Sequence, residues 1–226
     1  MHRRSFLTAA TLSAAGLASP ADLGAQAAAP AATREPRDVP RHPQDAWFDS
    51  IPGRHRLFLD ATNVEEAAGA LGFAWNFLRT SQTGYNLKDE DAAVVICLRH
   101  EATEFAFSND VWHKHDVLRT QKYKDPESGK KVKGGNILRV GSTDPKSYPD
   151  NFTFDDLAKR GVHFALCGVA TRGIARQIAG KDATKEASDA IIDELIAGAV
   201  PNSHLMASGI LAAQRAGEYG YTVIRG

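Results

Sequence analysis

One uninterrupted apolar run, AAVVICL at residues 92–98, constrains the fold of this chain more than any other feature. Seven residues are too few for a typical helix, and their β-branched members favour a strand. A strand with no polar face is buried on both sides, which is typical of the centre of a parallel sheet that helices cover. The rest of the chain must therefore supply further strands, and helices for both faces.

The remaining pattern meets that requirement. We predict further strands at 54–62, 162–166, 204–207 and 219–224, and helices at 64–78, 103–118, 154–160, 168–179, 187–197 and 209–216. Strands that alternate with helices form a mainly parallel sheet with right-handed crossovers. The predicted fold class is therefore α/β: a three-layer, flavodoxin-like, doubly wound and mainly parallel sheet of five strands.

The first residues indicate export. Arg3 and Arg4 are followed by Ser5-Phe6-Leu7, a mild apolar stretch and the cleavage-site pattern Ala25-Gln26-Ala27. This is typical of a twin-arginine signal peptide over residues 1–27, with an ordinary signal peptide as the alternative. The protein is then expected in the periplasm. A flexible, proline-rich linker is expected after the signal peptide, over residues 28–50. The domain is expected over 51–226, with a Lys-, Gly- and Pro-rich surface insertion at 119–150.

Charge and cysteine content exclude several classes of function. The 27 basic and 27 acidic residues cancel, so we expect no nucleic-acid partner. No apolar run in the body of the chain is long enough to cross a bilayer, so no membrane association is expected after signal removal.

Cys97 lies inside the apolar run 92–98 and is expected to be packed and inert. A disulfide between Cys97 and Cys167 is not favoured, because Cys97 precedes the end of its strand.

Ligands of open α/β sheets gather outside the carboxyl ends of the strands. Four clusters end the predicted strands: residues 60–63, 99–101, 167–168 and 208–209. Cys167 is the candidate catalytic residue, because a thiol at a helix N-terminus faces unpaired N–H groups that favour thiolate. A buried structural cysteine is the alternative interpretation. The candidate substrate-binding residues are Arg99, His100, Gly168, Ser208 and Gly209.

The sequence contains no strong metal or cofactor motif. His100-Glu101-x-x-Glu104, with His113 and His115 downstream, is a loose set of competent ligands, but it is not H-E-x-x-H. A solvated helix with polar caps explains it equally well, and His163 is expected to be a packing residue. No phosphate loop and no Gly-x-Ser-x-Gly elbow occur. We therefore predict neither a metal site nor a cofactor.

Three segments resemble a known family. The run GVHFALCGVATRGIA (161–175) is similar to the strand–Cys–helix segment of DsrE/DsrF-like proteins, the intracellular sulfur oxidation type. The tail ELIAGAVPNSHLMASGILAAQRAGEYGYTVI (194–224) is similar to that family's ending. The run VVICLRHEATEFAFSNDVWHKH (94–115) resembles its exported, twin-arginine-signal subgroup. The resemblance covers about 54–224, apart from the insertion.

The resemblance implies a flavodoxin-like domain that forms homo-oligomers. Sulfur-relay members of the family carry sulfur as a persulfide on a cysteine, and only Cys167 matches that position. The expected function is a thiol-based sulfur carrier or sulfurtransferase-like protein that exchanges sulfur with a partner thiol protein. One alternative is a non-catalytic, oligomeric module that binds a small ligand or metal. Another is a redox or flavin protein, which rests on fold analogy alone.

Overall fold

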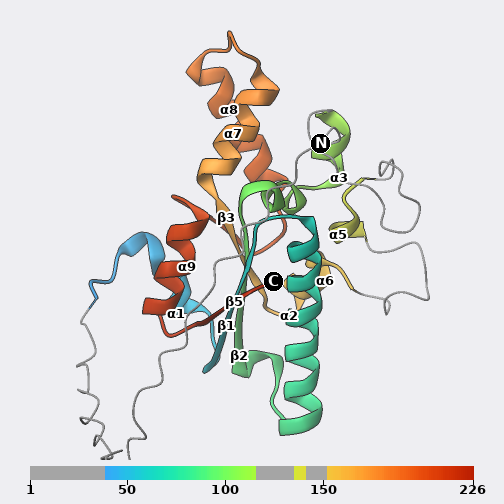
Figure 1. Ribbon diagram of the computed structural model, residues 1–226, viewed down its shortest axis with the longest axis vertical. Coiled ribbons are helices and arrows are strands. Elements are labelled where there is room, and N and C mark those ends of the chain that lie inside the picture. Colours follow the sequence, from blue (N-terminus) through green and yellow to red (C-terminus); the bar gives the residue numbers. More distant parts are fainter. Residues whose placement is uncertain (1–38, 116–134, 141–151) are drawn as a thin grey trace, which may run out of the picture. The chain divides into compact units, whose positions relative to one another are not determined.

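The computed structural model describes residues 39–115, 135–140 and 152–226 (Figure 1). The predicted signal peptide, the linker before residue 39 and most of the insertion lie outside the described residues. The described strands form one five-stranded sheet in the order β4-β3-β2-β1-β5, and every neighbouring pair is parallel. They are β1 (His55–Ala61), β2 (Ala92–Leu98), β3 (His163–Cys167), β4 (Ser203–Met206) and β5 (Thr222–Arg225). The predicted α/β fold class is confirmed.

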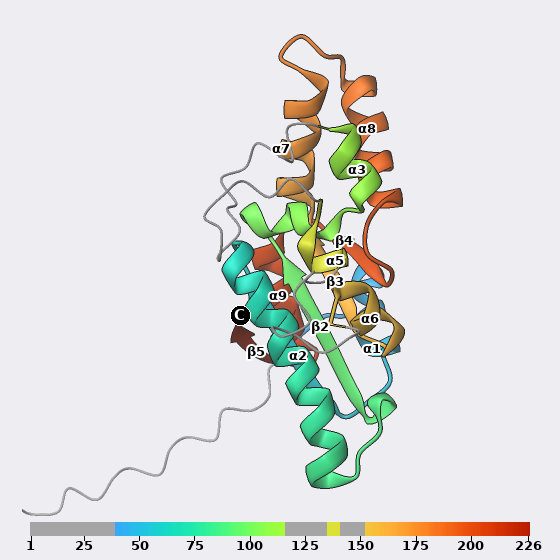
Figure 2. The same ribbon diagram turned by 90° about the vertical axis from the view of Figure 1, so that its right-hand side faces the viewer.

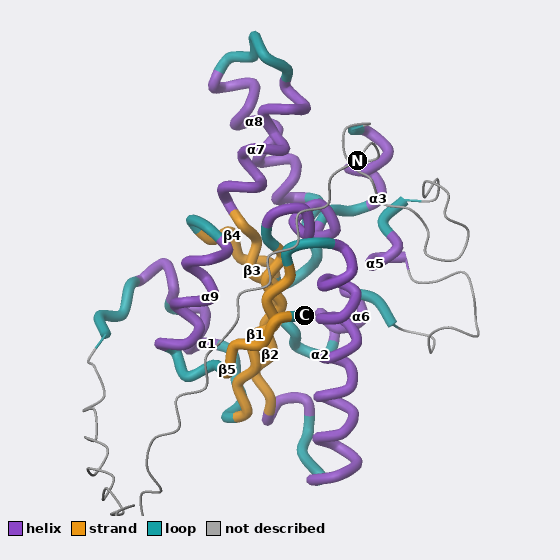
Figure 3. The backbone as a smooth tube through the Cα atoms, in the orientation of Figure 1, coloured by secondary structure: helices purple, strands orange, loops and turns teal. Residues whose placement is uncertain are grey.

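Helices cover both faces of the sheet and make the three layers (Figure 3). The described α-helices are α1 (Trp47–Ser50), α2 (Val64–Tyr85), α3 (Asn109–Lys114), α5 (Ile137–Val140), α6 (Phe154–Lys159), α7 (Gly168–Ala179), α8 (Lys185–Ala197) and α9 (Gly209–Glu218). Short 3₁₀ segments are η1 (Pro43–Asp45), η2 (Asp89–Asp91) and η3 (His100–Ala106). Helices α2 and α6 lie on one face of the sheet, and α1 and α9 lie on the other.

Strand alternation divides the core into two clusters. Leu59, Ile96 and Phe164 face α2 and α6 in the larger cluster. Phe58 and Val95 face the opposite way, toward α1 and α9. Every residue of β2 is buried, as its unbroken apolar run predicts.

The order of the strands places the helices. From β1 to β4 each strand is added beside the previous one, and the connecting helices pack into the larger cluster. After β4 the order in which strands are added reverses, because α9 leads the chain back across the sheet to β5, which lies beside β1. A right-handed crossover in the reverse direction must run over the opposite face, which is where α9 lies.

The segment predicted as one helix over 103–118 is instead two elements, η3 and α3. Phe107 is extended between them and forms an isolated bridge to Ala199. The fully buried amide of Asn136 donates to the carbonyl oxygens of Phe105 and Phe107, at 2.7 and 2.8 Å. Backbone carbonyls bonded to a distant side chain are unavailable to a continuing helix. This part of the predicted surface insertion is therefore buried structure.

The folded unit also begins earlier than the predicted boundary at residue 51. It starts at Val39, and α1 packs against the sheet with Phe48 fully buried. Asp45 accepts a hydrogen bond from Arg215 of α9 at 2.8 Å, and both side chains are buried. The described residues of the predicted linker are thus part of the domain.

No described helix combines the length and apolar character needed to cross a membrane.

Candidate functional site

The carboxyl ends of the strands lie side by side at one edge of the sheet, because all five strands are parallel. This edge gathers the residues that the sequence singled out: Arg99 follows β2, Cys167 ends β3, and Ser208 follows β4.

Cys167 occupies the position that its sequence context predicts. It is the last residue of β3 and the N-cap of α7, and its side chain makes no capping hydrogen bond. Its exposed fraction is 7%, whereas that of Cys97 is 0%. Both thiols are free, and these are the two cysteines of the chain. Cys167 is therefore also a buried residue, and it is the one of the two cysteines that keeps a small exposed fraction.

Gly168 holds the start of α7 against the end of β4. A Cβ atom on Gly168 would lie 2.5 Å from the carbonyl oxygen of Met206, closer than side chains approach backbone. The same position is 3.2 Å from Nη1 of Arg172, whose Nη2 donates to the carbonyl oxygen of Ala207 at 3.3 Å. The sequence reasoning missed Arg172, although a cation about one helical turn beyond Cys167 on a predicted helix was a usable signal.

Arg99 is a fixed cation at the neighbouring strand end. Its Nε and Nη2 donate to the two carboxylate oxygens of Asp60, at 2.7 and 2.8 Å, in a bidentate pair. The hydrogen bonds that Arg99 donates to Asp60 raise the pKa of Arg99. A Cβ on Gly209 would lie 2.4 Å from Cβ of Arg99, so the arginine stem runs under the start of α9. Arg99 and Gly209, both predicted as site residues, are in direct contact, and Asp60 is bound to Arg99.

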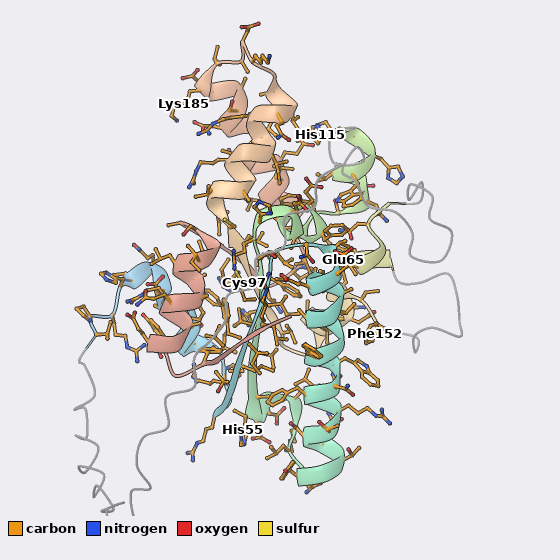
Figure 4. The ribbon with its side chains drawn as sticks, in the orientation of Figure 1. His55, Glu65, Cys97, His115, Phe152 and Lys185 are labelled. Atoms are coloured by element: carbon orange, nitrogen blue, oxygen red, sulfur yellow. The ribbon has the colours of Figure 1, made fainter. Side chains whose placement is uncertain are left out.

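Cys97 lies beneath this edge, within the sheet (Figure 4). Its Sγ–H donates to the carbonyl oxygen of Gly209 at 3.7 Å. Burial raises the pKa of the Cys97 thiol well above its usual value, and the charge of Asp60 adds to this. Cys97 therefore stays protonated, as a packed donor that helps to hold α9. In the register of β2 and β3 it pairs with Ala165 and not with Cys167.

The two remaining predicted residues have local roles in the described structure. Ser208 is the N-cap of α9, and its hydroxyl oxygen accepts a hydrogen bond from the amide of Leu211 at 3.3 Å. His100 is exposed at the start of η3 and has a left-handed backbone with φ of 55°. A hydroxyl that caps its own helix is partly occupied, so Ser208 is the less available of the two for a ligand.

A second ionic network lies at the end of β1. The carboxylate of Glu66 accepts hydrogen bonds from the amide and hydroxyl of Thr62, at 2.8 and 2.5 Å, and from Nε of Arg225 at 2.7 Å. Burial acts to raise the pKa of Glu66, but these hydrogen bonds outweigh it and hold the pKa at about 2. The network joins β5 to α2, and no local sequence pattern indicates it because its members are up to 163 residues apart in the chain.

The loose His and Glu set does not gather into a metal site. Nε2 of His115 lies 3.0 Å from a carboxylate oxygen of Glu194 on α8, and Nδ1 of His113 lies 2.7 Å from the carbonyl oxygen of Asn109. Among the described residues, no group of three or more His, Cys, Asp or Glu side chains is arranged to hold a metal ion.

His163, predicted to be a packing residue, begins β3 and is part of a stacked aromatic group away from the carboxyl ends of the strands. Its Nδ1 lies 2.9 Å from Nε2 of His204, and Trp47 stacks on His204 with ring centroids 3.9 Å apart. Burial lowers the pKa of both imidazoles, and the charge of His163 also lowers that of His204, to about 4. Both rings are therefore neutral at pH 7 and join α1 to the sheet.

No family model, curated protein or solved structure matches this chain. The function must accordingly be inferred from the strand-end geometry. That geometry consists of one cysteine with a small exposed fraction, the Arg172 side chain near the Gly168 position, the ion pair of Arg99 with Asp60, and a second thiol that is kept protonated.

Proposed function

We propose that this chain is an exported DsrE/DsrF-like protein that carries sulfur as a persulfide on Cys167. The observation that carries the proposal is the position of this thiol. It ends a buried strand, caps α7 without a side-chain hydrogen bond, and alone among the two cysteines has exposed surface. Unpaired amides at the start of α7 favour negative charge on the sulfur.

The proposed chemistry needs no added oxidant. The Cys167 thiolate attacks the outer sulfur of a donor persulfide, R–S–SH, and the S–S bond of the donor breaks. Cys167 becomes Cys–S–SH, and the donor leaves as the thiolate R–S⁻. A partner thiolate, R′–S⁻, then attacks the outer sulfur of the Cys167 persulfide, and the S–S bond of that persulfide breaks. The partner becomes R′–S–SH, and Cys167 leaves as the thiolate.

The charges at the strand ends suit this reaction. Arg172 contacts the Gly168 position, and Arg99 is held in place by Asp60. Fixed cations attract an anionic donor and stabilise a thiolate leaving group. The carboxylate of Asp60 offsets the charge of Arg99, so we assign the attraction of the donor, and direct contact with it, to Arg172.

The burial of Cys167 favours one alternative. A cysteine residue that is 7% exposed is also suited to a non-catalytic module whose strand ends bind a small ligand. The two functions differ in whether sulfur becomes covalently attached. The proposed setting is the periplasm, and the proposed partner is a protein with a reactive thiol; both follow from the predicted signal and the resemblance.

The test is to incubate the reduced protein with glutathione persulfide and measure its intact mass. We expect the mass of one added sulfur atom, located by peptide mapping on Cys167, and no addition to the Cys167→Ser variant. The Cys97→Ala variant is the matched control and should load like the unaltered protein, because Cys97 is packed and protonated. An unaltered protein that takes up no sulfur, or a Cys167→Ser variant that loads equally, would remove the sulfur-carrier proposal and leave the binding module.

A further inference from the structure

Helices α7 and α8 form an antiparallel hairpin that extends past the end of the sheet, as Figures 1 and 2 show from two directions. Lys185, at the start of α8, lies near the far end of this arm (Figure 4). Of the 13 residues of α8, Leu195 alone is fully buried. Helices in water are held mainly by packing of an apolar face. Ile178, Ile191 and Ile192 pack the inner side of the arm against the larger core cluster, and the outer sides of α7 and α8 stay exposed.

The uncovered side of α7 is basic. Val169, Arg172 and Arg176 are exposed and recur at helical spacing, so they share one face. Lys181 follows directly after the helix and is also exposed. Neither Arg176 nor Lys181 forms an ion pair with another described residue.

The uncovered side of α8 carries acidic residues and small alanines. Glu186, Ala190, Asp193 and Ala197 are exposed at the spacing i, i+4, i+7 and i+11, which places them along one face. Glu186 and Asp193 have no ion-pair partner within the described part of the chain. The two alanines between and beyond them leave room for another helix to approach closely.

A groove of about 810 Å³ runs between the two helices. Its lining includes Arg172, Arg176, Lys181, Lys185, Asp189 and Ile192. The carboxylate of Asp189 is already paired with Lys185. Three positive side chains thus face this groove without a counter-charge from the lining, and the groove favours an acidic occupant.

We propose that this arm docks onto the same arm of a second copy of the chain, with α7 of each copy against α8 of the other. Both faces are short: Arg172 and Arg176 are about 6 Å apart along the axis of α7, with Lys181 beyond the end of the helix, and Glu186 and Asp193 are about 10 Å apart along α8. A twofold arrangement makes the same set of contacts twice, which neutralises both unpaired faces at once. An unrelated acidic protein would neutralise α7 but leave the acidic face of α8 unpaired.

Charge reversal on each face tests this pairing. Arg176→Glu with Lys181→Glu makes both faces acidic, and Glu186→Lys with Asp193→Lys makes both faces basic; Arg172 is left unchanged because it lies beside Cys167. Molar mass is measured by light scattering during size-exclusion chromatography at low salt. We expect a dimer for the unaltered chain and half that mass for each variant, because like charges then face each other.

Mixing the two variants is the decisive step. Each supplies the charge that the other lacks, so the mixture should recover the dimer mass, and a chain that carries all four substitutions should dimerise by itself. Lys88→Glu with Arg54→Glu, at exposed positions remote from the arm, is the matched control and should remain a dimer. Raised salt should weaken the dimer.

Several results would overturn the proposal. They are a monomeric unaltered chain, reversal variants that remain dimeric, and folded variants whose mixture stays monomeric; circular dichroism establishes that the variants are folded. The Cys167→Ser variant should keep the dimer mass, so failure of the sulfur-carrier proposal and failure of this one are separately visible.

Discussion

Replacing Asn136 with alanine is expected to lower the free energy of unfolding by about 2–4 kcal/mol. The side chain is fully buried and makes three hydrogen bonds. Its amide donates to the carbonyl oxygens of Phe105 and Phe107, and its Oδ1 accepts from the amide of Leu138 at 3.1 Å. Removal takes one hydrogen-bond partner from each of two buried carbonyls and from the amide of Leu138, and each such loss costs about 1–3 kcal/mol, with partial relaxation reducing the sum.

Urea unfolding followed by circular dichroism measures this effect. Asn76→Ala is the matched control, because Asn76 is exposed on α2 and its loss should change stability by less than about 0.5 kcal/mol. Equal unfolding midpoints for the two variants would contradict the structural role that we assign to residues 135–140.

Replacing Gly168 with alanine is expected to destabilise the protein by about 1–3 kcal/mol. The added Cβ would lie 2.5 Å from the carbonyl oxygen of Met206 and 3.3 Å from that of Ala207. Both neighbours are backbone atoms and cannot swing away, so α7 must separate from the end of β4. Because Cys167 precedes this position, we also expect its thiol to become more exposed and to react faster with a thiol reagent.

Gly173→Ala provides the control within the same helix. A Cβ on Gly173 meets nothing within 4 Å, so alanine there removes the glycine penalty and should stabilise the helix by about 0.5–1 kcal/mol. Opposite signs for the two substitutions are expected in thermal unfolding. A pair of variants with the same change in stability would show that α7 and β4 do not meet closely at Gly168.

Local signals in the sequence were sufficient for most of the fold. The apolar run of β2 identified a central strand, and its bounds agree with the structure. Helix α7 also has its predicted bounds, because a strand with an unbroken apolar end precedes Gly168, and Gly180, with a φ of 91°, ends the helix. These features depend on neighbours in the chain, which a single sequence displays.

Contacts between residues far apart in the chain determine the elements that the sequence patterns did not predict. The break between η3 and α3 depends on Asn136, about 30 residues away. Residues 43–50 look like a linker because of their prolines and charges, yet Phe48 is buried and Trp47 stacks on His204 from β4. Composition reports average polarity, and it does not reveal which apolar residue finds a partner across the fold.

The position of the candidate site in the fold was predictable from the sequence, but its side-chain contacts were not. Strand ends directed attention to Arg99 and Cys167, since parallel strands end at a common edge. The pairing of Arg99 with Asp60, the position of Arg172 and the exposure of Cys167 all depend on side-chain packing. For the same reason, Arg99 was predicted to bind substrate directly, whereas two of its nitrogens are committed to Asp60.

The most direct measurement of the central claim is the alkylation of the native, reduced protein with iodoacetamide, followed by intact mass and peptide mapping. We predict one addition, on Cys167, while Cys97 reacts only after denaturant is added. The 7% exposure of Cys167 predicts a rate below that of a free cysteine but well above that of Cys97. A native protein in which neither thiol reacts, or in which Cys97 reacts first, would contradict the account.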